Sequence, residues 1–258
     1  MDYKNVSAVY FSPSGTTKQI MKTISSKFLT EVREIDLLQE KLSQNIEFME
    51  KDVALVGMPV FAGRIPQVCL ESLQRLQGKK TAAIVYVVYG NREYEDALLE
   101  LKEVMEEQGF MVIGAAAFIA HHSMFRKVAV NRPDQSDLQR IKNFAGDCVD
   151  KLKLENTGQW EALRIPGNHP YRAYSEIPVQ PWGDDRCDDC GICVELCPVH
   201  AIDPKNPRET DKAKCISCTA CMAACPQKAR DFHSPIYGAV CEKFEKLCAI
   251  RKEPETFL

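Results

Sequence analysis

Eight cysteines between residues 187 and 225 form two copies of one spacing, Cys-x2-Cys-x2-Cys-x3-Cys-Pro. The copies are Cys187, Cys190, Cys193 and Cys197 before Pro198, and Cys215, Cys218, Cys221 and Cys225 before Pro226. Three thiolates at this spacing can wrap three corners of a [4Fe–4S] cluster, but the fourth cysteine reaches the other cluster instead. We therefore expect a protein that moves electrons through two clusters, one on Cys187, Cys190, Cys193 and Cys225 and one on Cys215, Cys218, Cys221 and Cys197.

Two four-cysteine zinc sites are the alternative interpretation, because Cys-x2-Cys pairs also bind zinc. The three-cysteine loop, repeated with its trailing proline, favours iron–sulfur clusters. Disulfides are typical of small secreted domains, whereas this chain has 258 residues and a polar start without a signal segment. The remaining cysteines follow no ligand spacing and are interpreted as small buried hydrophobic residues: Cys69, Cys148, Cys241 and Cys248.

The composition is that of an ordinary globular protein, with 45% hydrophobic and 27% charged residues. The longest apolar runs are well short of the roughly 18 residues that a membrane span needs. A formal net charge of −3 provides no basic field for nucleic acid. We therefore expect a cytoplasmic protein without a nucleic-acid or membrane partner, in an anaerobic setting that suits oxygen-labile clusters. The oligomeric state stays open.

Residues 1–154 alternate strand-like and helix-like segments, which is typical of a doubly wound parallel α/β sheet. The expected strands are Val6–Phe11, Glu31–Leu37, Asp52–Met58, Thr81–Tyr89 and Phe110–Ala120. Helices are expected directly after Thr17 and at Pro66–Leu76, Tyr94–Gln108 and Gln135–Leu154. The first part of the chain is therefore expected to fold as one α/β domain.

The second part of the chain changes character at residue 155. Residues 155–183 carry four prolines, three glycines and both tryptophans, Trp160 and Trp182, and are interpreted as an ordered connector laid over the first domain. Residues 184–231 are expected to form a smaller α+β module around both clusters. Residues 232–258, with a helix near Ala239–Lys252, are expected to close back over one of the domains.

The segment Ser12-Pro13-Ser14-Gly15-Thr16-Thr17 lies between the first expected strand and the first expected helix. Its hydroxyls, its glycine and the N–H groups of a helix N-terminus suit a phosphate. A dinucleotide fingerprint and a nucleotide-triphosphate loop are both missing, so a monophosphate fits best. The alternative is a serine and threonine turn that only caps the helix.

Two further loops, Pro59–Pro66 and Tyr89–Tyr94, follow the third and fourth expected strands. In an open parallel sheet of strand order 2-1-3-4-5, ligands bind at the edge where these loops emerge. With these motifs, residues 1–154 resemble a flavodoxin. With the cysteine module attached, the chain resembles the flavodoxin-like proteins fused to a bacterial-type 2[4Fe–4S] ferredoxin, known as EFR1-type flavo-ferredoxins.

The resemblance implies that flavin mononucleotide (FMN) binds at this edge. It implies a phosphate site made of Ser12, Ser14, Gly15, Thr16 and Thr17. It implies that the isoalloxazine ring is flanked by Pro59, Val60, Phe61, Ala62, Gly63, Tyr89, Gly90 and Asn91, with Phe61 and Tyr89 where many flavodoxins have tryptophan and tyrosine.

Three residues near this edge are candidates for chemistry: Arg64, His121 and His122. Arg64 would balance a reduced flavin by its positive charge, and either histidine would donate to the flavin or to a substrate. The alternative for each is an ordinary solvated loop residue.

Two main hypotheses follow for function. In the first, the protein carries electrons between a redox partner protein, the clusters and FMN, and so links one-electron and two-electron chemistry. In the second, it is an FMN-dependent reductase fed by the clusters, with a small-molecule acceptor bound near the long segment His121–Asp134. A redox sensor is a weaker third possibility. An acidic docking surface would consist of Asp184, Asp185, Asp188 and Asp189.

Overall fold

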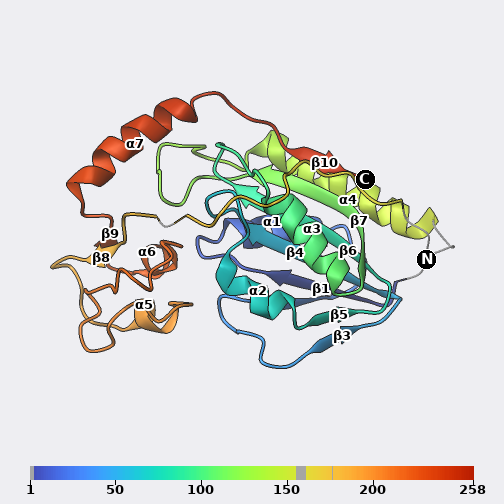
Figure 1. Ribbon diagram of the computed structural model, residues 1–258, viewed down its shortest axis with the longest axis horizontal. Helices are drawn as coiled ribbons and strands as arrows, with labels where there is room; N and C mark the ends of the chain where they lie inside the picture. Colours follow the sequence, from blue (N-terminus) through green and yellow to red (C-terminus); the bar gives the residue numbers. More distant parts are fainter. Residues whose placement is uncertain (1–2, 155–160, 176) are drawn as a thin grey trace.

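Apolar strands that alternate with amphipathic helices in the first part of the chain build five strands of a six-stranded sheet, and a C-terminal strand adds the sixth (Figure 1). The computed structural model describes residues 3–154, 161–175 and 177–258. The sheet contains β1 (Asn5–Tyr10), β2 (Val32–Asp36), β4 (Asp52–Pro59), β6 (Thr81–Tyr89), β7 (Phe110–Ile119) and β10 (Glu255–Phe257). Its order is β10-β7-β6-β4-β1-β2, so the five parallel strands follow the predicted order 2-1-3-4-5. The flavodoxin-like fold class is therefore confirmed.

Helices cover both faces of the sheet, which explains why the central strands are almost continuously apolar. On one face, α1 (Thr16–Ser25) and α4 (Gln135–Leu154) pack on a core that includes Tyr10 and Tyr86. On the other face, α2 (Gln67–Leu73) and α3 (Ala97–Glu107) pack on a second core. All nine residues of β6 are buried between the two. The carboxyl ends of the strands therefore emerge at one edge, where loops can hold a ligand.

Three elements differ from the sequence prediction. The helix expected at Pro66–Leu76 ends at Leu73, and the chain then forms β5 (Leu76–Gly78), which pairs with β3 (Ile46–Phe48). The helix expected at Ala239–Lys252 is α7 (Pro235–Leu247), whose start is favoured by a proline in its first turn. The C-terminal residues add β10 antiparallel to β7, a pairing that no local pattern predicts.

The small module folds around the two cysteine runs and lies beside the sheet, with α7 leading from it back toward the sheet (Figure 1). The antiparallel pair β8 (Trp182–Gly183) and β9 (Arg230–Asp231) joins its two ends. Each run continues into a short helix, α5 (Ile192–Glu195) or α6 (Ala220–Ala224). Because the pair brings both ends together, the two runs form one folding unit.

The segment between the two modules lies along α3. The backbone N–H groups of Asn168 and Arg172 donate to the carboxylate of Asp96 at 2.9 and 2.7 Å. The hydroxyl of Tyr174 donates to Glu100 at 3.0 Å. These bonds satisfy the buried carboxylate of Asp96 and fix the path of the chain across the first domain.

Of the two tryptophans of this connector, Trp182 lies within the described residues. Trp182 is 45% exposed, and its ring lies 4.5 Å from that of His233. Trp160 lies outside the described residues. Of the helices in the described ranges, none is long and apolar enough to cross a membrane.

Arg64 has a structural contact instead of the predicted position beside a flavin. Its Nε and Nη2 donate to Glu100 at 2.8 and 2.7 Å, and the two side chains are only 11% and 3% exposed. The hydrogen bond to Glu100 raises the pKa of Arg64. The rings of Tyr171 and Tyr174 lie 4.8 and 4.2 Å from the guanidinium. Glu100 balances the charge of Arg64, and Nη1 of Arg64 donates to the Arg172 carbonyl at 2.6 Å, so Arg64 fastens the connector to the first domain.

The substitution Glu100→Gln should therefore destabilise the protein strongly. It leaves the Arg64 guanidinium buried without its anion, and removing one partner of a buried pair costs about 3–5 kcal/mol. Urea unfolding of the full chain, followed by circular dichroism, measures this loss. The matched control is Glu71→Gln, because Glu71 pairs with Lys41 at 2.7 Å with both side chains more than half exposed. Equal losses in the two variants would contradict the structural role.

Candidate cofactor sites

The eight cysteines of the two runs line two small cavities in crossed sets. The first cavity is lined by Cys187, Cys190, Cys193 and Cys225. The second is lined by Cys197, Cys215, Cys218 and Cys221. Each cavity thus takes three cysteines from one run and the last cysteine of the other, which is the combination that the spacing predicts. Cluster binding by these particular cysteines stays a prediction. Within the described ranges, no three His, Cys, Asp or Glu side chains gather as they would on a single metal ion.

Each run begins its short helix from a residue in the left-handed region. Gly191 has a φ of 77° and precedes α5, and Thr219 has a φ of 68° and precedes α6. Both residues directly follow the second cysteine of their run. The left-handed conformation lets the third cysteine of each run point back toward its cavity. The two runs therefore have the same backbone conformation at this position, although one has a glycine and the other a threonine.

The cavities are suited to negatively charged thiolates. Backbone N–H groups of Ala201 and Ala229 donate to the Sγ atoms of Cys197 and Cys225 at 3.2 and 3.3 Å. Burial raises the pKa of the Cys221 thiol to about 11, and the guanidinium of Arg230 opposes that rise. Such donors stabilise a thiolate, which is the form that binds iron. The donor set therefore fits an iron–sulfur cluster.

The four other cysteines lie outside both cavities. Cys69, Cys148 and Cys248 are buried, and Cys241 is partly buried on α7. Burial raises the pKa of the Cys148 thiol well above its usual value. Their surroundings agree with the interpretation of these residues as small apolar core residues.

The loop after β1 has the features of a phosphate site. Helix α1 begins directly after Gly15, whose φ is 86°. The Ser12 hydroxyl accepts the N–H of Lys18 at 2.9 Å, and the hydroxyls of Ser14 and Thr16 lie 3.2 Å apart. The first N–H groups of a helix have no partner within the helix, so they can bind an anion here. The predicted phosphate residues Ser12, Ser14, Gly15, Thr16 and Thr17 all lie at this helix start.

A cavity of about 370 Å³ lies at the carboxyl ends of β4, β6 and β7. This volume falls within the roughly 300–1,000 Å³ of typical ligand pockets. Its wall on the first domain includes most of the residues predicted to flank a flavin ring: Val60, Phe61, Ala62, Gly63, Tyr89 and Gly90. Pro59 ends β4 and is not part of the wall. We call this space the ring cavity.

Asn91, which was predicted to flank the ring, directs its side chain elsewhere. Its Nδ2 donates to the carbonyls of Cys248 and Ile250, both at 2.9 Å, and its Oδ1 accepts the N–H of Lys252 at 2.9 Å. These three bonds engage both polar atoms of the side chain. Asn91 instead fastens the C-terminal segment to the loop after β6.

The two candidate histidines have different surroundings. His122 lines the ring cavity, and its Nδ1 accepts the N–H of Met124 at 3.2 Å. Burial lowers the pKa of His122 to about 4, so the ring is neutral near pH 7 and carries its proton on Nε2. A side chain at Gly90 would overlap the His122 ring, which explains the glycine. His121 Nε2 lies 2.8 Å from the Arg126 carbonyl, and His121 does not line the cavity.

The opposite wall of the ring cavity comes from parts of the chain that the sequence analysis did not assign to a site. They are the connector residues Ile177, Pro178 and Val179, the module residue Ser217, and Val240 and Phe244 of α7. Phe125 and Phe244 stack at 4.0 Å, where the two domains meet. The proline-rich connector and the apolar face of α7 were the only signals of this wall.

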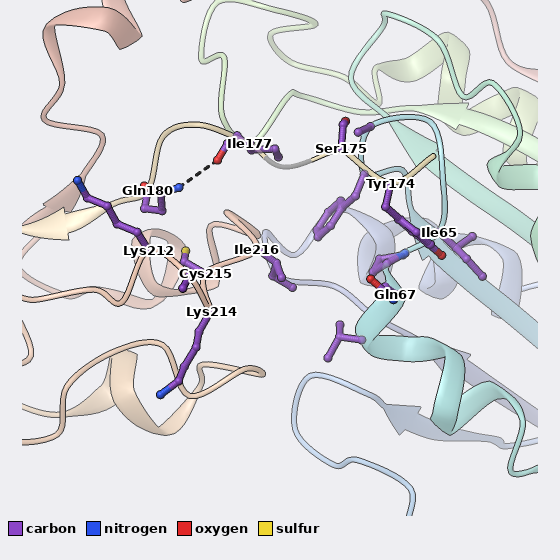
Figure 2. A pocket seen from close by; sticks show the side chains of 15 residues that line it. Ile65, Gln67, Tyr174, Ser175, Ile177, Gln180, Lys212, Lys214, Cys215 and Ile216 are labelled. Carbon is purple, nitrogen blue, oxygen red and sulfur yellow. Dashed lines mark hydrogen bonds between the residues drawn. The ribbon is translucent and has the colours of Figure 1, made fainter. Parts of the chain in front are cut away.

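A second cavity of about 410 Å³ lies between the first domain and the second cysteine run. Figure 2 shows Ile65 and Gln67 on one side of it and Cys215 and Ile216 on the other. Cys215 also lines the cavity of the second cysteine set. The second set therefore faces the first domain through Cys215, whereas no cysteine of the first set lines this inter-domain cavity.

Comparisons with known proteins agree with these two parts. Residues 186–230 match the 4Fe–4S dicluster domain family. This match supports binding of [4Fe–4S] clusters and disfavours the zinc alternative. A search of curated proteins gives no match.

Solved structures similar to the chain include several flavodoxins. An archaeal flavodoxin is 22% identical, with 58% of this chain and 99% of that chain covered and a TM-score of 0.43. A Bacillus cereus flavodoxin is 14% identical, with coverages of 57% and 98% and a TM-score of 0.42. A rubredoxin:oxygen oxidoreductase of Desulfovibrio gigas is 15% identical, with coverages of 58% and 36% and a TM-score of 0.44. By its strand order and its cysteine module, the chain is a flavodoxin-like domain joined to a 4Fe–4S dicluster domain.

Proposed function

We propose that this protein transfers electrons between two [4Fe–4S] clusters and FMN, and so links one-electron to two-electron chemistry. The observation that carries the proposal is the shared boundary between the two cofactor sites. Ser217, in the second cysteine run, lines the ring cavity together with Phe61 and Tyr89. A cluster on the second set would therefore lie next to a flavin ring in that cavity.

FMN is the flavin that these residues suit. The loop at the start of α1 offers hydroxyls and helix-start N–H groups for one phosphate, and the sequence contains no Gly-x-Gly-x-x-Gly dinucleotide fingerprint. The ring cavity offers apolar and aromatic walls, with Nε2 of His122 as a hydrogen-bond donor. When bound, the flavin supplies a site that accepts one or two electrons.

The arrangement suggests the order of the cofactors. The cavity of the second cysteine set shares Cys215 with the inter-domain cavity, which Phe61 also lines. No cysteine of the first set lines the inter-domain cavity, and the wall of the first set's own cavity includes the acidic residue Asp188. We therefore propose that a redox partner exchanges electrons at the first cluster, and that the second cluster exchanges them with the flavin.

A reductase is the second candidate function, and one observation favours it. His122 is neutral near pH 7 and borders the ring cavity, so it can donate a hydrogen bond to a small molecule bound there. Phe125, from the segment where a substrate pocket was expected, also lines the cavity. The two arginines of the same segment have structural roles instead. Arg126 pairs with Asp231 at 2.8 Å, and Arg132 pairs with Asp137.

The cofactor content is the first test. Protein purified without oxygen is expected to contain about eight iron atoms, about eight labile sulfides and about one FMN per chain, because each cubane holds four of each atom. Elemental analysis, sulfide assay and the mass of the released flavin measure these quantities. Zinc in place of iron would contradict the cluster proposal. A bound flavin adenine dinucleotide would contradict the FMN proposal.

The order of the clusters is tested by ligand variants from each set. Cys218→Ser should abolish flavin reduction through the clusters, because Cys218 belongs to the set nearest the ring cavity. Cys190→Ser should retain most of it, because Cys190 belongs to the outer set. Stopped-flow absorbance after mixing with reduced viologen measures the flavin rate. Electron paramagnetic resonance (EPR) reports which cluster remains.

Cys241→Ser is the matched control for these variants, because Cys241 lines neither cluster cavity. It should keep the full iron content and the wild-type rate. If flavin reduction is retained in Cys218→Ser, which has lost the second cluster, but abolished in Cys190→Ser with its second cluster intact, the proposed order is wrong.

Carrier and reductase are separated by a screen of the reduced protein. The carrier proposal predicts that oxidised small metabolites leave the flavin reduced for minutes without oxygen, whereas an oxidised ferredoxin or flavodoxin reoxidises it. Absorbance near the flavin maximum follows the reaction. Rapid turnover with one particular metabolite, lost in His122→Asn, would favour the reductase instead.

A further inference from the structure

Arg230 places a buried positive charge between the two cysteine sets. It lies on β9, is 3% exposed, and pairs across the strand with Gly183 of β8. Its Nη1 lies 3.9 Å from Sγ of Cys193, which belongs to the first set. Nη2 reaches the wall of the second cavity, because it donates to the Pro181 carbonyl and to the Thr210 hydroxyl. Arg230 therefore lines the first cavity and hydrogen-bonds the wall of the second.

The other partners of Arg230 are neutral. Nη2 donates to the Pro181 carbonyl at 3.0 Å and to the Thr210 hydroxyl, and Nη1 donates to the Pro207 carbonyl. The neighbouring carboxylate, Asp231, pairs with Arg126 instead. No ion pair found in the described part of the chain includes Arg230, and its Nε has no hydrogen-bond partner. The guanidinium is thus a buried cation without a protein anion.

A buried cation without an anion is strongly unfavourable. A cubane held by four thiolates carries net negative charge, and that charge grows by one when the cluster is reduced. The negative charge of the clusters is therefore what balances Arg230. Because the interaction with a fixed cation strengthens as the cluster becomes more negative, Arg230 favours the reduced form of each cluster.

We propose that Arg230 is the shared counter-ion of both clusters, and that it raises their two reduction potentials together. This inference rests on the proposed function, since it requires both clusters. The proposed function can hold even where this inference fails, because backbone N–H groups alone could set the potentials of two clusters. Arg230 is a positioned charge and takes no part in bond making or breaking.

The test is a pair of substitutions measured by anaerobic redox titration of the full chain with EPR detection. Arg230→Met removes the charge and keeps an apolar side chain of similar reach. It should shift the reduction equilibrium of both clusters by at least about tenfold toward the oxidised form. For a one-electron couple, this shift lowers each reduction potential by about 59 mV. Arg230→Lys keeps the charge, so both clusters should have reduction potentials close to those of the wild-type protein.

Arg208→Met is the matched control, because Arg208 also touches the first run through the Cys187 carbonyl but pairs with Asp185 at 3.1 Å near solvent. It should move both potentials much less. Potentials unchanged in Arg230→Met, or a shift of one cluster alone, would overturn the shared role.

Iron content distinguishes the remaining outcomes. If wild-type protein lacks two clusters, the proposed function fails before Arg230 is tested. If Arg230→Met does not assemble clusters while Arg230→Lys does, with near wild-type potentials, the counter-ion role is supported through assembly. If Arg230→Lys also fails to assemble clusters, assembly requires the guanidinium hydrogen bonds to Pro181 and Pro207, which a lysine cannot make. In that case the counter-ion proposal is wrong.

Discussion

The stacking of Phe125 on Phe244, at 4.0 Å, is the contact on which the relation between the two domains depends. Phe125 belongs to the loop after β7, and Phe244 belongs to α7, which follows the cysteine module. Around them, Val179 of the connector and Phe232, directly after the module, complete one apolar cluster. Burial of these side chains holds the module against the sheet edge. Without this apolar cluster, the ring cavity would lose one of its walls. The second cysteine set would also no longer lie beside the first domain.

The C-terminal segment supports this arrangement from the other side. Asn91 binds three backbone groups of that segment, and the buried Arg132 donates to the Lys252 carbonyl. Strand β10 then joins β7 at the end of the sheet. The chain therefore starts in the first domain, builds the module and returns to the first domain. Both ends of α7 are tied, so the position of Phe244 is determined by more than one contact.

Two buried arginines show how the same residue type takes opposite roles. Arg64 lies in a bidentate pair with Glu100, so its charge is cancelled and only its geometry matters. Arg230 lies among carbonyls, a hydroxyl and the Cys193 thiol, so its charge is available to whatever the cysteine sets hold. Sequence position favoured Arg64 as the residue with an electronic role, because it follows a loop at the ligand edge. The difference comes from the partners that folding supplies.

The sequence by itself determined the features that depend on short spacings. The crossed cysteine sets follow from the spacing of the cysteines, and the parallel sheet covered by helices follows from apolar runs long enough to be buried on both faces, as β6 is. Only the tertiary structure decided the roles of Arg64, Asn91 and Arg230 and which cysteine set faces the first domain. Their partners are distant in the chain: Glu100 is 36 residues from Arg64, and Cys248 is 157 from Asn91. A local pattern carries no information about such a partner, because long-range packing brings the two groups together only after each element has formed.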